Sequence, residues 1–319
     1  MSTPKVVITE HLDEGAAEWL RNRASVVRQN YKDSEALGRE LADAEALIVR
    51  TYTRVEGALL EAAPLLKVVG RAGAGLDNID LEACRSRGVR VVHTPDANTQ
   101  AVVEYVWGLI LDAVRPRTNL TEDVKPEIFH QLRGEKVGRQ LSDLTLGVLG
   151  MGRIGRRVAE VAGAFSMRVL CNDLLTKAEL ELAEDQHGEF VEAAALWAES
   201  DLLTIHIDGR ASNRRFIDSE VLETLRPECL VINTSRGFVI DPGALAEWAQ
   251  RVQSDGGGAI LDVHEPEPPG EEYPFFDLPN VRLLPHLASR TDRALRNMSD
   301  VVFDVMRVLR GEEPKHAAV

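Results

Sequence analysis

The chain has 319 residues, of which 44 % are hydrophobic and 28 % charged. These proportions are typical of folded globular domains and exclude a disordered or collagen-like chain. At roughly 100–200 residues per domain, the length predicts two domains. The 37 Lys and Arg against 51 Asp and Glu give a net charge of −14, which argues against a nucleic-acid partner and against binding to anionic membranes.

The three cysteines, Cys84, Cys171 and Cys229, are widely spaced. They form neither a disulfide framework nor the paired spacing of a metal site, so we expect a reducing compartment and no metal. Only a short apolar stretch precedes Glu10, and no run approaches the roughly 18–20 apolar residues of a membrane helix. We therefore expect a cytoplasmic protein without a signal peptide.

In the first third of the chain, short apolar runs alternate with helical patterns. Strands are predicted at 5–9, 46–49, 67–69 and 89–92, and helices at 14–23 and 55–63. Because parallel strands need crossover helices, this rhythm predicts a parallel sheet with helices on both faces.

A long helix is predicted from Thr99 to Arg115. It is apolar on nearly every side, which is typical of a helix buried between domains or used in an oligomer interface. The stretch from Arg117 to Gln140 is polar and poorly periodic. We interpret it as a connection or arm.

A second series of apolar runs follows the arm. It predicts strands at 145–149, 167–171, 202–206, 230–233, 258–262 and 281–284, with helical patterns between most of them and a last one at 292–309. The sequence thus predicts an α/β fold of two doubly wound parallel-sheet domains with a boundary near residue 98. Periodicity alone leaves open on which domain the last helix packs.

Residues 150–155, Gly-Met-Gly-Arg-Ile-Gly, form a G-x-G-x-x-G motif between a predicted strand and a predicted helix. With Asp173 placed 18 residues past Gly155 at the end of the next strand, the motif is typical of a dinucleotide-binding Rossmann domain, whose helix N-terminus receives the pyrophosphate. Asp173 would accept the ribose hydroxyls and repel a 2′-phosphate, which favours NAD, while Lys177 keeps NADP open. The alternative is a glycine-rich turn that binds nothing.

Five segments in order resemble the D-isomer-specific 2-hydroxyacid dehydrogenases, and within them the D-3-phosphoglycerate dehydrogenases. They are 70–80 (GRAGAGLDNID), 150–155 with Asp173, 233–237 (NTSRG), 261–263 (LDV) with Glu267-Pro268, and 285–289 (PHLAS). The similarity runs from about residue 5 to about residue 315. It implies hydride transfer between NAD and a small D-2-hydroxy acid or its 2-oxo acid, with a 3-phosphoglycerate-like substrate expected.

In this resemblance Arg236, Glu267 and His286 carry the chemistry. Arg236 would clamp the substrate carboxylate and polarise the neighbouring carbonyl. His286 would act as general acid and base, and Glu267 would bind its other ring nitrogen. Taken alone, the histidine could be structural, the arginine could cap a turn, and Glu265 competes with Glu267 because both precede a proline.

The resemblance also implies two sets of binding residues. The cofactor set is Gly150, Gly152, Arg153, Ile154, Gly155, Asp173, His206, Thr234, Arg236, Asp262 and His286, with Asp262 at the nicotinamide carboxamide. The substrate set is Arg50, Arg71, Gly73, Ala74, Gly75 and Arg236, in which the glycine loop would form an anion nest and the arginines would bind a phosphate. The alternatives are a tight turn, solvated surface charges and a structural His206.

The resemblance further implies the organisation of the protein. Residues 1–98 with 290–319 would form a flavodoxin-like substrate-binding domain, and 99–289 the NAD-binding Rossmann domain, with a cleft between them. A homodimer through region 99–140 is expected, and because the sequence ends at Val319 we expect no regulatory domain.

Some positions depart from the family pattern. His264 stands where an aromatic residue is usual, Ala74 where phosphoglycerate enzymes often have threonine, and Asp208 where the family usually has proline. These departures leave the substrate open. One alternative is a reductase of hydroxypyruvate, glyoxylate or another 2-oxo acid, and another is an NAD(H)-sensing binding protein of the corepressor type.

Overall fold

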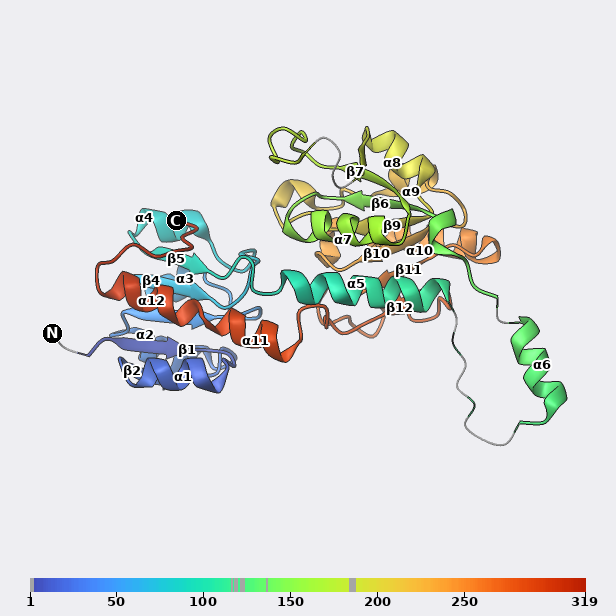
Figure 1. The fold of residues 1–319 in the computed structure, drawn as a ribbon. Coiled ribbons are helices and arrows are strands. Elements are labelled where there is room, and N and C mark those ends of the chain that lie inside the picture. Colours follow the sequence, from blue (N-terminus) through green and yellow to red (C-terminus); the bar gives the residue numbers. More distant parts are fainter. Residues whose placement is uncertain (1–2, 116, 118–119, 121–123, 136, 184–187) are drawn as a thin grey trace. The chain divides into compact units, whose positions relative to one another are not determined.

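A computed structural model describes residues 3–115, 117, 120, 124–135, 137–183 and 188–319 (Figure 1). The chain divides into two compact units. The first contains the residues up to Ala101 together with Ser289–Val319, and the second contains Val102–Ala288.

The first unit is built on a parallel sheet of five strands in the order β2-β1-β3-β4-β5. This is the strand order of flavodoxin-like doubly wound folds. The strands are β1 (Lys5–Ile8), β2 (Ser25–Arg28), β3 (Ala46–Val49), β4 (Val68–Arg71) and β5 (Arg90–His93). The helices are α1 (Glu14–Arg21), α2 (Ser34–Leu41), α3 (Gly57–Glu61), α4 (Leu81–Ser86), α11 (Asp292–Ser299) and α12 (Val301–Leu309).

Alternation along the strands divides the core of this unit between two faces. In β3 every residue is buried, with Ile48 packed among residues of α1, α11 and α12 and Leu47 among residues of α2, α3 and α4. This is the two-sided burial expected of a central parallel strand. The C-terminal helices therefore cover the same face of the five-stranded sheet as α1.

The second unit is built on a parallel sheet of seven strands in the order β12-β11-β10-β9-β6-β7-β8. This is the Rossmann order extended by one strand. The strands are β6 (Thr145–Leu149), β7 (Arg168–Asn172), β8 (Glu189–Phe190), β9 (Leu202–Ile205), β10 (Leu230–Asn233), β11 (Gly258–Leu261) and β12 (Val281–Leu283). The α-helices of this part of the chain are α5 (Thr99–Val114), α6 (Pro126–Glu135), α7 (Arg153–Ala164), α8 (Ala193–Glu199), α9 (Ser219–Thr224) and α10 (Pro242–Val252).

Two core clusters again lie on opposite faces of the sheet. Helices α5 and α7 pack with Val148 on one face, whereas α8, α9 and α10 pack with the neighbouring residue Leu149 on the other. The predicted class, two parallel-sheet α/β folds, is thereby confirmed.

The structure corrects the expected elements in several places. Strand β2, helices α2 and α4 and strand β8 were not predicted. The arm holds helix α6, which stands away from the sheet (Figure 1) and buries none of its residues, so it shows no apolar period. The last predicted helix is two helices that meet at Asp300. Residues 116, 118–119, 121–123 and 136 of the expected dimer region lie outside the described residues.

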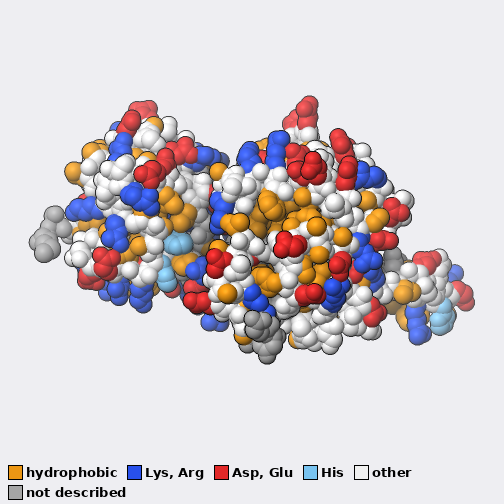
Figure 2. All heavy atoms as spheres, turned by 90° about the horizontal axis from the view of Figure 1, so that it is seen from above, with side chains coloured by type: hydrophobic (Ala, Val, Ile, Leu, Met, Phe, Trp, Pro, Cys, Tyr) orange, Lys and Arg blue, Asp and Glu red, His pale blue; other side chains and the backbone are white. Residues whose placement is uncertain are grey.

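Charged side chains of both signs are interspersed over the face seen in Figure 2. Many charged side chains of the described residues form local ion pairs, and Arg168 with Glu199 at 2.7 Å is one of those in the chain. The net negative charge therefore does not gather into one acidic field on this face. No helix among the described residues is long and apolar enough to cross a membrane.

Candidate active site

The predicted glycine turn and His206 lie where the strand order of the second sheet reverses, between β6 and β9. Open α/β sheets bind ligands outside the carboxyl ends of the strands at such a point. Gly150 follows β6 with φ +95°, and a Cβ there would lie 2.8 Å from the carbonyl carbon of His206, which follows β9. A Cβ at Gly155 would lie 1.8 Å from the Gly150 oxygen. Both positions therefore require glycine.

The N-terminus of α7 is open to a ligand. Gly152 is its N-cap residue, and nothing lies within 4 Å of the position that a Cβ would take there. Arg153 begins the helix, and Ile154 packs against the core beneath it. The free N–H groups and partial positive charge of a helix start suit an anion such as a pyrophosphate.

Asp173 follows β7 and lies against the glycine turn. Its carboxylate accepts hydrogen bonds from the N–H of Met151 at 2.6 Å and of Leu175 at 2.9 Å. Lys177 lies 5.9 Å from the ring centroid of Phe190. The acid that the sequence assigned to a ribose thus lies beside the predicted phosphate-binding turn.

The structure also brings Arg210, which was not among the predicted site residues, near Asp173. Asp208 binds its guanidinium through three hydrogen bonds of 2.6–3.0 Å. The Asp208 carboxylate foremost, and the Asp173 carboxylate in addition, raise the pKa of Arg210. The signal in the sequence was the acid at position 208, where the family usually has proline.

Arg236 lies on a turn that Asn233, the last residue of β10, holds in place. The Asn233 side-chain oxygen accepts from the Ser235 N–H at 3.0 Å, and its amide nitrogen donates to the Arg236 carbonyl at 2.9 Å. Next to Arg236, Thr234 Oγ1 is buried with no hydrogen-bond partner within the described part of the chain. A buried hydroxyl in that condition is costly unless a ligand binds it. This turn therefore fits a polar ligand.

Glu267 and His286 are in direct contact. His286 Nδ1 lies 2.6 Å from Glu267 Oε1, whereas the competing Glu265 pairs with Arg214. Burial would raise the pKa of Glu267, but its hydrogen bond to His286 and the charge of that ring outweigh burial and place the pKa below its usual range. Glu267 is therefore a carboxylate around neutral pH.

Asp262 supports the turn after His286. It is fully buried, and its two carboxylate oxygens accept from the N–H groups of Leu287 and Ala288, both at 2.8 Å. Burial raises the pKa of Asp262, against these two hydrogen bonds. His286 itself has φ +55°, an unusual value for a residue with a side chain. Asp262 thus holds the turn in which His286 adopts this backbone.

His206 is neutral in this fold. Its Nε2 lies 2.9 Å from Thr204 Oγ1, and desolvation lowers its pKa to about 3. The ring can therefore offer a hydrogen bond at neutral pH but no positive charge.

In the first unit, Arg50 and Arg71 both lie near Met298 of α11. Arg50 Nη2 lies 4.0 Å from Met298 Sδ. The Cβ position of Gly73 is 3.5 Å from the same sulfur and 1.7 Å from Arg71 Nη1. The Glu10 carboxylate fixes the loop that begins at Arg50 by accepting from its N–H at 3.0 Å. The structure therefore brings the two predicted substrate arginines together.

Arg290 is a third cation, near Arg50, and it was not among the residues predicted from the sequence. Desolvation foremost, and then the charge of Arg290, lower the pKa of Arg50. Arg290 directly follows the matched segment 285–289, and this position was the only signal in the sequence. In the glycine loop, the Gly73 N–H donates to the Arg71 carbonyl at 2.9 Å, and the Ala74 carbonyl lies 3.0 Å from His93 Nδ1, while Gly75 is partly exposed.

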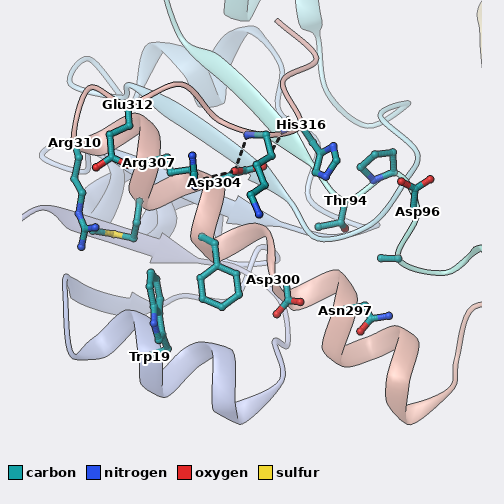
Figure 3. Close-up of a pocket in the computed structure, with 15 residues that line it drawn as sticks. Trp19, Thr94, Asp96, Asn297, Asp300, Asp304, Arg307, Arg310, Glu312 and His316 are labelled. Atoms are coloured by element: carbon teal, nitrogen blue, oxygen red, sulfur yellow. Dashed lines mark hydrogen bonds and ion pairs between the residues drawn. The ribbon is translucent and has the colours of Figure 1, made fainter.

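A separate cavity of about 590 Å³ lies in the first unit, and no predicted site residue lines it (Figure 3). At its centre the Asp304 carboxylate accepts from the N–H groups of Lys315 and His316 at 2.9 and 3.0 Å. On α1, Trp19 packs edge-on against Phe303 with ring centroids 4.6 Å apart. The polar contacts in this cavity attach the C-terminal segment to α12.

Comparison with known proteins identifies the class. The model of the family "D-isomer specific 2-hydroxyacid dehydrogenase, NAD binding domain" matches residues 107–288. The chain therefore belongs to the D-isomer-specific 2-hydroxyacid dehydrogenase family, as the sequence motifs predicted. Its second unit carries the NAD-binding domain of that family, so NAD is the cofactor.

The names of similar proteins refer to several different acid substrates. The chain is 33 % identical over 315 residues to D-3-phosphoglycerate dehydrogenase of Archaeoglobus fulgidus, covering 98 % of this chain and 59 % of the relative. It is 34 % identical over 323 residues to glyoxylate reductase of Aeropyrum pernix, covering 98 % and 95 %. The structure of D-lactate dehydrogenase from Aquifex aeolicus, complexed with NAD and lactic acid, matches with a TM-score of 0.81 at 28 % identity over 96 % of each chain.

The lengths of the relatives differ. This chain spans 54–59 % of the phosphoglycerate dehydrogenases that it matches from Archaeoglobus, Methanocaldococcus and Synechocystis. The matches thus define the family and leave its acid substrate open.

Proposed function

We propose that the protein is an NAD-dependent oxidoreductase that interconverts a small D-2-hydroxy acid and its 2-oxo acid by hydride transfer. The observation that carries the proposal is the Glu267–His286 contact of 2.6 Å. It lies at the carboxyl edge of the sheet that also carries the Gly150 turn and the Arg236 turn. An acid–base pair, a cation for a carboxylate and a dinucleotide site are the groups this chemistry needs.

In the proposed mechanism NAD, when bound, would supply or accept the hydride, and His286 would move the proton. Glu267 binds Nδ1 of the ring, so Nε2 is the nitrogen that faces the substrate oxygen. In the reducing direction Nε2 gives its proton to that oxygen as C2 is reduced, and in the oxidising direction it takes the proton back. The Glu267 carboxylate stabilises the protonated ring that this cycle requires.

Arg236 would bind the substrate carboxylate. A guanidinium can bind both oxygens at once, which fixes C2 relative to the nicotinamide and polarises the adjacent carbonyl. The Asn233 contacts that hold the turn would limit the motion of the Arg236 backbone and so support this alignment.

The cofactor would bind along the β6–β9 switch point. Gly150, Gly152, Arg153, Ile154 and Gly155 would receive the pyrophosphate, and Asp173 the adenosine ribose. The unsatisfied Thr234 hydroxyl supports a role beside the nicotinamide half, together with His206 and Asp262. The carboxylate at Asp173 favours NAD over NADP.

We further propose a substrate with a second anionic group, as in 3-phosphoglycerate. Arg50 and Arg71 both lie near Met298, and the charge of Arg290 acts on Arg50, so this part of the first unit offers guanidinium groups that can bind a phosphate in bidentate fashion. The N–H groups of Ala74 and Gly75 would add to this site. The second candidate is reduction of glyoxylate or hydroxypyruvate, favoured by the match to the Aeropyrum glyoxylate reductase over 95 % of its length.

We propose that two copies associate through α5 and the arm. The arm exposes apolar side chains that a lone chain would leave in water, including Ile128 at 46 % and Phe129 at 45 % exposure. Light scattering tests this proposal. A mass near twice the 35.2 kDa chain supports it, and a mass near one chain refutes it.

A panel of 2-oxo acids tests the activity. NADH oxidation is followed by fluorescence with 3-phosphohydroxypyruvate, hydroxypyruvate, glyoxylate and pyruvate. We expect turnover with at least one acid and the highest kcat/KM with the phosphorylated one. Tight NADH binding without turnover of any acid would overturn the proposed enzymatic activity and favour a corepressor-type sensor.

A further inference from the structure

His264, which stands where the family usually has an aromatic residue, lies beside the proposed catalytic group. It is 8 % exposed, and both of its ring nitrogens have partners. Nε2 lies 2.7 Å from the Leu284 carbonyl oxygen, and Nδ1 lies 3.1 Å from the Tyr273 hydroxyl. The ring also packs edge-on against Tyr273, with centroids 5.5 Å apart.

These partners define the tautomer of the ring. A carbonyl oxygen can only accept, so Nε2 of His264 carries the proton and donates to Leu284. Burial raises the pKa of Tyr273 to about 12, so its hydroxyl keeps its proton and can donate to Nδ1 of His264. Both ring nitrogens of His264 thus have hydrogen-bond partners, and the ring links the segment of Tyr273 to the segment of Leu284.

His264 touches the segments of all three proposed catalytic residues. A Cβ at Gly237, the residue after Arg236, would lie 2.0 Å from the His264 carbonyl atoms, so the two backbones are in direct contact. The His264 N–H lies 3.5 Å from Glu267 Oε2. The bond to Leu284 fixes the chain two residues before His286.

We propose that His264 is a positioning residue that aligns Arg236, Glu267 and His286, with Tyr273 holding its ring in the required tautomer. This inference rests on the proposed function for its catalytic meaning. An ordinary aromatic residue at position 264 would fill the same space, but it would leave the Leu284 carbonyl and the Tyr273 hydroxyl without this partner. A buried polar group without a hydrogen-bond partner costs free energy, and this cost favours movement of the segment that carries the group.

The test compares His264→Phe, His264→Gln and Tyr273→Phe with the wild type. His264→Phe keeps the aromatic packing and removes both hydrogen bonds. We expect it to lower kcat by about 10–100-fold, because small displacements of aligned groups are costly. The affinity for NADH should stay within about twofold, because the glycine turn is untouched. His264→Gln can still donate to Leu284 and should recover part of kcat, and Tyr273→Phe should lie between.

The pH profile separates positioning from general loss of structure. The titratable groups around Glu267 are His286 after β12, His264 and Glu265 on its own segment, and Tyr273. Glu265 is paired with Arg214. The His264 N–H helps to keep the pKa of Glu267 low. Displacing it should raise that pKa, so activity should be lost at a higher pH on the acid side. Trp248→Phe, on α10 in the same core, removes none of these hydrogen bonds and should lower the melting temperature without moving the profile.

A second readout does not depend on turnover. In histidine-labelled protein, NMR can detect the Nδ1 proton that His286 shares with Glu267, assigned by its absence in Glu267→Gln. We expect this signal in the wild type and in Trp248→Phe, and expect it broadened or lost in His264→Phe. An unchanged signal together with an unchanged kcat and pH profile would overturn the proposal. If the wild type turns over no acid, and the signal is present in the wild type but lost in His264→Phe, the proposed function alone is overturned.

Discussion

Glu267 Oε1 and His286 Nδ1 lie 2.6 Å apart although the two residues are 19 positions apart in the chain. Glu267 follows β11 and His286 follows β12, which pair in parallel. Adjacent parallel strands end at the same edge of a sheet, so residues that follow them can meet there. This is the relationship on which the proposed acid–base chemistry depends.

Glu267→Gln should lower kcat by about 10²–10⁴-fold, because the neutral amide stabilises the protonated His286 ring poorly. The pKa of Glu267 lies below its usual range. Wild-type activity should therefore persist into mildly acidic solution and fall as the pH drops through that pKa, and the variant should lack this step. Glu265→Gln is the matched control, since Glu265 pairs with Arg214. Equal kcat losses in both variants would contradict the assignment.

The same shift predicts a change in stability with pH. A carboxyl group whose pKa is lowered by folding stabilises the folded state above its unfolded pKa and loses that contribution as the pH falls through the folded pKa. Chemical unfolding of Glu267→Gln should show a smaller loss of stability than the wild type on acidification below about pH 4.5. If the free energy of unfolding falls equally with pH in the two proteins, this prediction is contradicted.

Arg236→Lys should lower kcat/KM by about 10–100-fold, because an ammonium cannot reproduce the two parallel hydrogen bonds to a carboxylate. Arg214→Lys retains a positive charge near Glu265 and is the control. Steady-state kinetics with the preferred acid measures the effect. A loss confined to NADH affinity would mean that Arg236 serves the cofactor alone.

Asp173→Ser should weaken NADH binding and strengthen NADPH binding, changing their ratio by about tenfold or more. The gain for NADPH should depend on Arg210, which is near Asp173. Adding Arg210→Ala to Asp173→Ser should therefore reverse it. Fluorescence titration measures both affinities, and an unchanged ratio would remove Asp173 from the ribose site.

Arg290→Ser should lower kcat/KM for 3-phosphohydroxypyruvate about tenfold more than for glyoxylate, because the phosphate loses one of its cationic partners. Arg50→Ala and Arg71→Ala should show the same selectivity. The nearby exposed Arg293→Ser should leave both acids unaffected. Equal losses for the two acids in Arg290→Ser, Arg50→Ala and Arg71→Ala would remove the phosphate assignment.

Much of the fold was predictable because its central strands are short, largely apolar and buried on both faces. Strand β6 and strand β10 are examples. Strand β2 was missed because its Ser25–Arg28 sequence is only partly buried. Helix α6 was missed because no residue of it packs on a core. Patterns of hydrophobicity report burial, so elements without it leave little signal.

The proposed catalytic residues were found because each lies in a short recognisable segment. The sequence motif alone identifies Glu267 as the partner of His286. The role of His264 could not be found in this way, because its bond to Leu284 joins residues 20 apart. Arg290 was missed for a related reason, since its neighbour Arg50 comes from the opposite end of the chain.

Transfer of deuterium tests the central claim most directly. The preferred 2-oxo acid is reduced with NADH carrying deuterium at one or the other face of nicotinamide C4, and the product is examined by mass spectrometry and chiral chromatography. We predict that one of the two labelled cofactors gives a D-2-hydroxy acid with a single deuterium at C2. A product without deuterium from either cofactor, or an L-2-hydroxy acid, would contradict it.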